Sequence, residues 1–265
     1  MIQAIDRAAQ ILLKLQGSRH LGITELATAL GLPPSTVHGI VKSLHQHGLV
    51  AKESNSNRYM LGPALLKLSS VYLDSLDVRA RSMRWTRELS RRTGLSTRLG
   101  VKLFNEVMIA HHDPRPDGSE QMLETGLVIP IHASAMGKVL LAYHPEDLDD
   151  LASSLRSLTG DTITDLETLR AELHDVAEQG FATEHDEAIL GESSVAVPVA
   201  DQSGAVVAAI AVVLPSSEFP PQDNLLNDLR ETGRNISREL GSNVWPPVPD
   251  PSSGTALLAP PLRSV

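Results

Sequence analysis

The chain of 265 residues contains no cysteine, and aromatic residues make up only 3% of it. Without cysteine, disulfides, thiolate metal sites and a cysteine nucleophile are all excluded. Long apolar runs are missing too, since none approaches the roughly 20 residues of a membrane-spanning helix. The first seven residues lack the charged and apolar regions of a signal peptide. We therefore expect a soluble, cytoplasmic protein that has no membrane partner.

Positive charge is scarce and unevenly placed. The formal net charge is −9 at pH 7. Residues 1–62 hold six lysines and arginines against three acids, a net +3, so the rest of the chain carries −12. A basic segment over residues 1–62, joined to an acidic remainder, indicates that the protein contacts phosphates through this segment only. Because the excess is modest, we expect a dimer or higher oligomer to combine several such segments.

The most informative motif occupies residues 23–61. Apolar residues at helical spacing predict a helix over 23–31, which Gly31 and the following Leu32-Pro33-Pro34 end. The same spacing predicts a second helix over 34–47, and a two-stranded hairpin follows over 49–61. With a first helix over 3–16, this order predicts a winged helix-turn-helix domain over residues 1–62 that binds double-stranded DNA.

The outer face of the second helix carries the candidate DNA contacts. A glycine inside a helix costs about 1 kcal/mol against alanine, and a close approach to DNA would explain Gly39. Any amphipathic helix has a polar face, but the turn, the wing and the charge asymmetry favour DNA. Lys42 and His38 are the expected readers of bases or phosphates. The full predicted set, including three residues of the wing, is Ser35, Thr36, His38, Gly39, Lys42, Ser43, Asn55, Asn57 and Arg58.

The remainder of the chain predicts an α+β domain. An apolar linker helix over 63–77 is expected to pack on a partner subunit or on the first domain. Residues 78–243 alternate between helical and strand patterns, which predicts an effector-sensing domain on a mainly antiparallel sheet. Strands are expected at 97–103, 107–112, 121–124, 193–200 and 205–214, and helices at 79–93, 135–143, 145–157, 165–179 and 224–240. Residues 244–265 are proline-rich and aperiodic, which predicts a disordered tail.

These features resemble one known family over residues 3–241, the IclR-type transcription regulators. The resemblance rests on the winged domain, the linker helix, the segment from His132 to Ala142, and Gly180-Phe181-Ala182 with the acidic residues after it. Stretches such as Val78-Arg79-Ala80-Arg81 are most similar to members that regulate glycerol operons. The resemblance implies a homodimer or homotetramer that binds an inverted-repeat operator and responds to a small metabolite.

The resemblance also implies an effector site. In members that sense glyoxylate, effectors contact positions that match Ala135 and Met136, an acid that matches Glu184, and the position of Ser194. Two serines of those proteins match Ala211 and Val213 here, which disfavours a keto acid, as does repulsion by an ionised Glu184. Ser134 is expected to cap a helix whose free amides at 135–137 suit a hydroxyl or an anion. We expect a small hydroxylated effector such as glycerol or glycerol 3-phosphate. The sequence does not indicate an arginine that would bind the phosphate.

Other functions fit the sequence less well. The chain lacks a nucleophile elbow and a P-loop, so we expect no catalytic residue and no cofactor. His111, His112, His132 and His185 lie on separate predicted elements, and we expect no metal site. An architectural DNA-binding protein would leave the acidic domain without a role. A repressor of a small catabolic operon is the main hypothesis, and an activator or repressor that senses an organic acid is the alternative.

Overall fold

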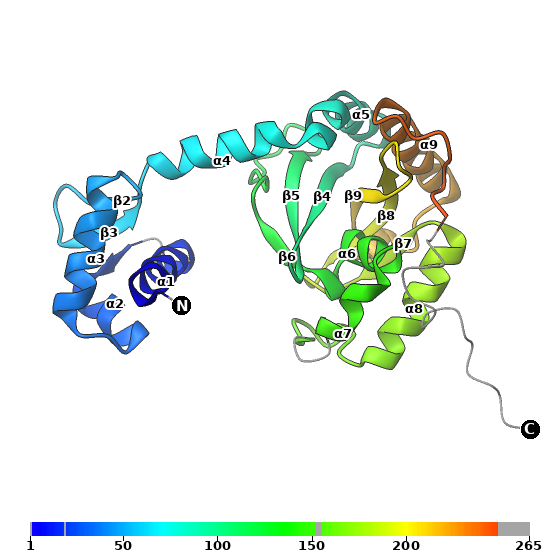
Figure 1. The fold of residues 1–265 in the computed structure, drawn as a ribbon. Coiled ribbons are helices and arrows are strands. Elements are labelled where there is room, and N and C mark those ends of the chain that lie inside the picture. Colours follow the sequence, from blue (N-terminus) through cyan, green and yellow to red (C-terminus); the bar gives the residue numbers. More distant parts are fainter. Residues whose placement is uncertain (1, 19, 152–154, 249–265) are drawn as a thin grey trace, which may run out of the picture. The chain divides into compact units, whose positions relative to one another are not determined.

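The computed structural model describes residues 2–18, 20–151 and 155–248, and it divides at Ser75/Leu76 into two compact units. Figure 1 shows their helices and strands. Among the described helices, none has both the length and the apolar character needed to cross a membrane.

The first unit is a winged helix-turn-helix, as predicted. Its small antiparallel sheet has the order β1-β3-β2, and β1 is a strand that the sequence did not predict. The core between its helices holds Ile11, Leu15, Leu26, Val37 and Val41, each at most 1% exposed. The elements are α1 (Gln3–Ser18), β1 (Leu21–Gly22), α2 (Ile23–Leu30), α3 (Pro34–Gln46), β2 (Val50–Lys52), β3 (Arg58–Leu61) and α4 (Ala64–Ser75).

Local chemistry fixes the turn between α2 and α3. Gly31 adopts a left-handed conformation with φ of 63°, and the amide of Leu32 donates to the carbonyl of Ala27 at 3.0 Å. Helices commonly end with a left-handed residue and a hydrogen bond of this kind, and glycine adopts the left-handed conformation without strain. Pro33 is extended and Pro34 occupies the first turn of α3, where its missing N–H costs nothing.

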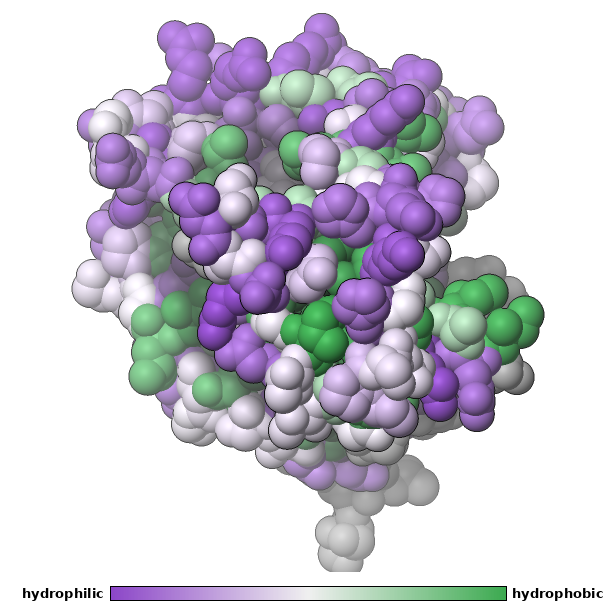
Figure 2. Space-filling model, turned by 90° about the vertical axis from the view of Figure 1, so that its left-hand side faces the viewer, coloured by the Kyte–Doolittle hydropathy of each residue, from purple (hydrophilic) through white to green (hydrophobic). Residues whose placement is uncertain are grey.

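Helix α4 clusters with the first unit, which ends at Ser75. The amide of Ala64 donates to the carbonyl of Gly48 at 3.1 Å, which ties the start of α4 to the wing. None of its residues is buried within the single chain, and Leu66, Leu68, Val71 and Tyr72 are 46–72% exposed. On the face drawn in Figure 2, hydrophobic side chains form separate patches in a mostly hydrophilic surface.

The second unit is built on a six-stranded antiparallel sheet of order β6-β5-β4-β9-β8-β7. Helices α5 and α9 pack on one face, and α6 packs on the other with α8 behind it (Figure 1). The strands are β4 (Ser96–Leu103), β5 (Glu106–Asp113), β6 (Val128–Pro130), β7 (Ala182–His185), β8 (Glu192–Ala200) and β9 (Val206–Pro215). The helices are α5 (Asp77–Thr93), α6 (Ala135–Ala142), α7 (Leu148–Leu151), α8 (Leu166–Gln179) and α9 (Asp223–Glu239), with short 3-10 turns at Ile131–Ala133, Pro145–Asp147 and Ser216–Glu218.

Two expectations for this unit are wrong, and a third is wrong in part. Residues 121–124 form no strand but belong to an irregular loop over 114–127, and the edge strand is β6. The helix expected over 145–157 is a 3-10 turn followed by α7, and residues 155–157 are not helical. Of the predicted disordered tail, Trp245 is fixed to the unit, because its indole donates to the carbonyl of Pro198 at 3.1 Å. Residues 249–265 lie outside the described part of the chain.

Candidate DNA-binding surface and effector site

The outer face of α3 is open to solvent in the first unit. Val37 and Val41 face inward, at 0% and 1% exposure, and Ile40 packs against the same core. Ser35, His38, Gly39, Lys42 and Ser43 are exposed, and Thr36 is half-buried. A Cβ built on Gly39 meets no atom within 4 Å. Internal packing of the chain therefore gives no reason for the glycine.

The wing places its three predicted residues differently from one another. Asn55 and Asn57 are exposed in the turn between β2 and β3. Arg58 is also exposed, but its guanidinium donates to Glu25 Oε1 at 2.7 Å and to the carbonyl of His20 at 3.1 Å. Arg58 thus fastens the wing to the start of α2, and a contact with DNA has to compete with this ion pair.

The start of α6 is buried against the sheet. Ser134 caps the helix as predicted, because its Oγ accepts from the amide of Gly137 at 3.1 Å. The amide of Gly137 is therefore occupied. Of the three amides that were expected to be free, those of Ala135 and Met136 have no acceptor within the helix. Both residues are buried, and a Cβ on Gly100 of β4 would overlap Met136 Sδ. Glycine at this position lets α6 approach the sheet closely.

Glu184 lies on β7, directly opposite Ser194 of β8. Its Oε1 accepts from Ser194 Oγ at 3.2 Å and its Oε2 accepts from the amide of Glu187 at 3.1 Å. Burial, assisted by the nearby charge of Glu187, raises the pKa of Glu184 to about 7. A carboxyl group with this pKa is about half protonated at neutral pH. Glu184 is therefore only partly ionised at neutral pH, and the expected repulsion of an acidic effector is reduced.

The register of the sheet brings further predicted residues into line. Ser194 is opposite Val213 of β9, and Val213 is opposite Ser96 of β4. Ala211 is opposite Arg98 of β4, on the face that α6 covers. Ala211 is 1% exposed and packs in the same core as Met136. Of the seven residues predicted for the effector, only Val213 lines the described cavity beside β4.

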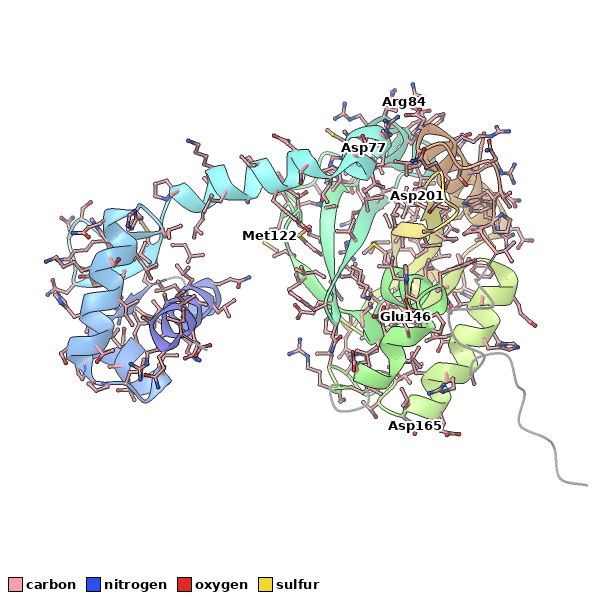
Figure 3. The ribbon with its side chains drawn as sticks, in the orientation of Figure 1. Asp77, Arg84, Met122, Glu146, Asp165 and Asp201 are labelled. Carbon is pink, nitrogen blue, oxygen red and sulfur yellow. The ribbon has the colours of Figure 1, made fainter. Side chains whose placement is uncertain are left out.

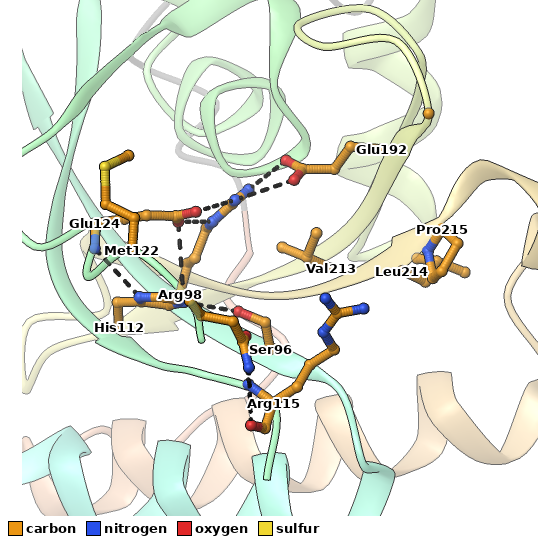
Figure 4. A pocket seen from close by; sticks show the side chains of 12 residues that line it. Ser96, Arg98, His112, Arg115, Met122, Glu124, Glu192, Val213, Leu214 and Pro215 are labelled. Carbon is orange, nitrogen blue, oxygen red and sulfur yellow. Dashed lines mark hydrogen bonds and ion pairs between the residues drawn. The ribbon is translucent and has the colours of Figure 1, made fainter. Parts of the chain in front are cut away.

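This cavity has a volume of about 290 Å³ and a charged lining (Figure 4). It lies between β4, the end of β9 and the loop over residues 114–127. Its residues come from segments that are far apart in the sequence, which is why periodicity did not reveal it. The lining includes Ser96, Arg98, His112, Arg115, Met122, Glu124, Glu192 and Val213.

Arg98 is the principal charged group of the cavity, and the sequence analysis missed it. Its side chain is 7% exposed and lies between the carboxylates of Glu124 and Glu192. Burial alone would lower the pKa of Arg98, but the hydrogen bonds to these two carboxylates raise it above its usual value. The available signal was a charged residue in the middle of a predicted strand, where burial of the charge is expensive unless it is paired.

His112 supports the same cluster from β5. Its Nδ1 accepts from the amide of Glu124 at 3.2 Å, so the ring proton is assigned to Nε2, which lies 2.8 Å from Ser96 Oγ. Burial lowers the pKa of His112. The ring is therefore neutral at pH 7, and it positions the loop that carries Glu124.

The histidines considered for a metal site have separate partners. His112 faces Ser96, the neighbouring His111 pairs with Asp113 at 3.0 Å, and His132 Nε2 lies 3.1 Å from the carbonyl of Arg156. Within the described ranges, His144, Glu146 and Asp147 form the one group of three potential ligands. Lys102 pairs with Asp147 of this group.

Comparison with known families agrees with both units. The profile of the IclR helix-turn-helix domain matches residues 4–54. The profile described as the bacterial transcriptional regulator IclR C-terminal domain matches residues 70–238, more than half of the chain. The chain belongs to the IclR family. Members of this family regulate transcription, so the chain is a DNA-binding regulator with an effector-binding domain and not an enzyme.

Individual IclR-type relatives match nearly the whole chain. A glycerol operon regulatory protein of Streptomyces coelicolor is 36% identical over 249 residues, which cover 91% of this chain and 97% of the relative. Another, from Streptomyces griseus, is 38% identical over 247 residues with the same coverage. The crystal structure of an IclR transcriptional regulator from Alicyclobacillus acidocaldarius has a TM-score of 0.75 at 27% identity, and the match covers 90% of this chain and 98% of that one.

Proposed function

We propose that this IclR-type regulator is a metabolite-responsive repressor of a small catabolic operon such as glycerol utilisation. It acts in the cytoplasm as a homodimer or homotetramer on an inverted-repeat operator. The observation that carries this proposal is the solvent-facing side of α3, which presents small and polar side chains around Gly39. In a helix-turn-helix, the second helix enters the major groove.

Oligomerisation is supported by charge and by α4. The first unit carries a net charge of only +3 over residues 1–62, which gives a single copy few phosphate contacts. Two copies double these contacts and match the symmetry of an inverted repeat. Helix α4 supplies an interface, because no described residue of the single chain covers its exposed Leu68 and Tyr72.

The effector is proposed to be a short hydroxylated metabolite. Glu184 and Ser194 offer a carboxyl and a hydroxyl group that hydrogen-bond with hydroxyl groups of a ligand. Val213 provides apolar surface beside them. The glycerol operon regulators of Streptomyces, which match over 91% of the chain, point to glycerol or glycerol 3-phosphate. Binding at this sheet shifts the population between arrangements of the protein that do and do not bind DNA.

A gel-shift titration tests this proposal. The full chain is incubated with the DNA upstream of its own gene and of the adjacent operon, with and without glycerol or glycerol 3-phosphate. We expect specific binding that at least one of the two ligands weakens, and an unchanged affinity for DNA in a Glu184→Gln protein that responds less to the ligand. Specific binding that only pyruvate or glyoxylate weakens would contradict the effector assignment.

The alternative of an organic-acid sensor is favoured by one observation. Glu184 has a pKa of about 7, so its proton is available to a ligand carboxylate near neutral pH. The same titration separates the two functions when it includes glycerate, pyruvate and glyoxylate at equal concentration.

A further inference from the structure

We propose that Arg98 is the anion-binding residue of the effector cavity and that Glu124 occupies it as an internal ligand until an acidic effector displaces it. This inference rests on the proposed function, because it takes the cavity beside β4 as part of the effector site. It adds that the effector carries an acidic group, with a phosphate monoester as the favoured class. It also identifies the loop over residues 114–127 as the segment that the effector releases.

The guanidinium of Arg98 binds two carboxylates with the geometry that it would use for an anionic ligand. One edge, Nε and Nη2, donates to both carboxylate oxygens of Glu124, with Nη2 at 2.8 Å from Oε1. The other edge donates to Glu192, with Nη1 at 2.7 Å from Oε1 and Nη2 at 3.3 Å from Oε2. Paired bonds of this kind are what arginine forms with carboxylates and phosphates. Each edge is thus an anion site filled by the chain's own side chain.

Glu124 is the more weakly fixed of the two glutamates. It lies on the loop over 114–127, which contains no helix or strand. Its neighbours Met122 and Leu123 are 71% and 69% exposed, and Met122 lies at the margin of the second unit (Figure 3). Glu192, in contrast, begins β8 and is paired with Pro215 of β9. Moving Glu124 needs only a loop rearrangement, whereas moving Glu192 disturbs the sheet.

The charge balance explains why an anion has to replace Glu124 rather than join it. Arg98 and Arg115 balance the two ionised glutamates of the cavity, so its charge does not favour an added anion. Without Glu124, the same groups have a net charge of +1, which attracts an anion. His112 is neutral because burial lowers its pKa. Exchange of a carboxylate for a phosphate on Arg98 therefore restores the paired state of this buried charge.

The exchange also connects ligand binding to movement of the chain. Glu124 anchors the loop through its carboxylate on Arg98 and through its amide, which donates to His112 Nδ1 at 3.2 Å. A ligand that takes the first contact leaves this second bond, while Gly126 and Leu127 keep the end of the loop bonded to Ile109 of β5. An uncharged polyol does not compete for Arg98. It leaves the loop in place, so acidic and neutral ligands differ in effect as well as in affinity.

Calorimetry on the full chain tests the exchange with inorganic phosphate, glycerol 3-phosphate, D-glycerate and glycerol as probes. Glu124→Gln keeps the size of the side chain and removes its charge. We expect it to raise the affinity for phosphate and glycerol 3-phosphate about tenfold and to leave that for glycerol unchanged. Glu120→Gln, an exposed neighbour on the same loop, is the matched control and should change none of these affinities.

A second readout follows the loop itself. Hydrogen–deuterium exchange over residues 114–127 should rise when wild-type protein binds glycerol 3-phosphate, and it should already be raised in Glu124→Gln without ligand. Arg98→Lys keeps the charge but loses the paired geometry, and its affinity for glycerol 3-phosphate should fall at least tenfold.

Three results would overturn the inference, and they have different meanings. If glycerol binds the wild-type protein and the anions bind neither it nor Glu124→Gln, Arg98 is a structural ion-pair residue and the proposed function stands. If Glu124→Gln weakens anion binding instead of strengthening it, Glu124 is part of the ligand site rather than its competitor. If none of the four probes binds either protein, the proposed effector class itself fails, and the inference fails with it.

Discussion

Glu184 shows how a single side chain acquires its properties from burial. It is 4% exposed, yet it retains two hydrogen-bond donors, Ser194 and the amide of Glu187. The sequence identified this residue only through a family resemblance, since acidity alone does not reveal burial. Its raised pKa depends on the register between β7 and β8 and on the position of Glu187. Both are properties of the folded chain.

The pKa of Glu184 predicts a pH dependence of stability. Because the pKa rises from 4.5 in the reference state to about 7 in the fold, the folded protein holds a proton in this window that the unfolded chain has released. The free energy of unfolding should therefore fall as pH rises from 4.5 to 7. In Glu184→Gln this component is absent, a difference on the order of 3 kcal/mol between about pH 5 and pH 8.

Urea denaturation of wild-type and Glu184→Gln proteins at both pH values measures this difference. The neighbouring charges of Lys138, Glu172, Glu187 and Glu192 are common to both proteins, so their own titration largely cancels. Parallel pH profiles of the two proteins would show that Glu184 is ionised in the fold over the whole range.

Lys42 is the residue of α3 whose contribution to DNA binding is easiest to measure. It is exposed on the outer face of α3. If its ammonium group meets a phosphate, Lys42→Ala should weaken binding to all sequences and reduce the salt slope by about one. If it reads a base, the loss should be roughly 1–3 kcal/mol and confined to the operator. Fluorescence anisotropy at several salt concentrations distinguishes the two, with Lys67→Ala on α4 as a control that removes the same charge. Unchanged binding by a folded Lys42→Ala protein would mean that another face of the domain meets DNA.

At the scale of elements, the sequence predicted what local chemistry determines. Helices α2 and α3 and the turn between them follow from apolar spacing, Gly31 and Pro34, all within a few residues of one another. The short strands β1 and β7 were missed, because each has little periodicity of its own and depends on its pairing partner. The strand predicted over residues 121–124, in the loop over 114–127, has no pairing partner in the described sheet. Arg98 and its two glutamates could not be connected, since the three residues meet only when the sheet has formed.

Gly39 leads to a prediction about the helix α3 as an element. Its Cβ position is empty, so Gly39→Ala fits the fold without a clash. Alanine favours the helix by about 1 kcal/mol, and the variant should unfold at a higher temperature than the wild type. Its affinity for the operator should nevertheless fall, because the added methyl group occupies the space where the helix approaches DNA most closely.

Thermal unfolding and operator binding of the same Gly39→Ala preparation provide the two readouts. A rise in stability with lower affinity assigns the glycine to DNA contact. A rise in stability with undiminished affinity would mean that the groove does not approach the helix at this position.

At the scale of the whole molecule, charge and apolar surface are divided between the two units. The acidic second unit does not favour contact with a polyanion, so DNA binding depends on the first unit and on the number of copies that bind together. The sequence indicated this division, because composition can be read without a structure. Which surface joins the copies depends on exposure, and exposure is visible only in the fold.

Helix α4 gives the last prediction. Leu68 is 59% exposed, and Ser70 is exposed on the other side of the same helix. If Leu68 packs on its counterpart in a second copy, Leu68→Glu removes the burial of two leucines by symmetry, about 3–6 kcal/mol in all, and buries two like charges. Analytical ultracentrifugation at micromolar concentration should then show dissociation toward monomer, and operator affinity should fall at least tenfold. Ser70→Glu adds the same charge and should alter neither the sedimentation nor the affinity. An intact dimer of Leu68→Glu that still binds the operator would place the interface on the second unit, and the apolar face of α4 would then need a different partner.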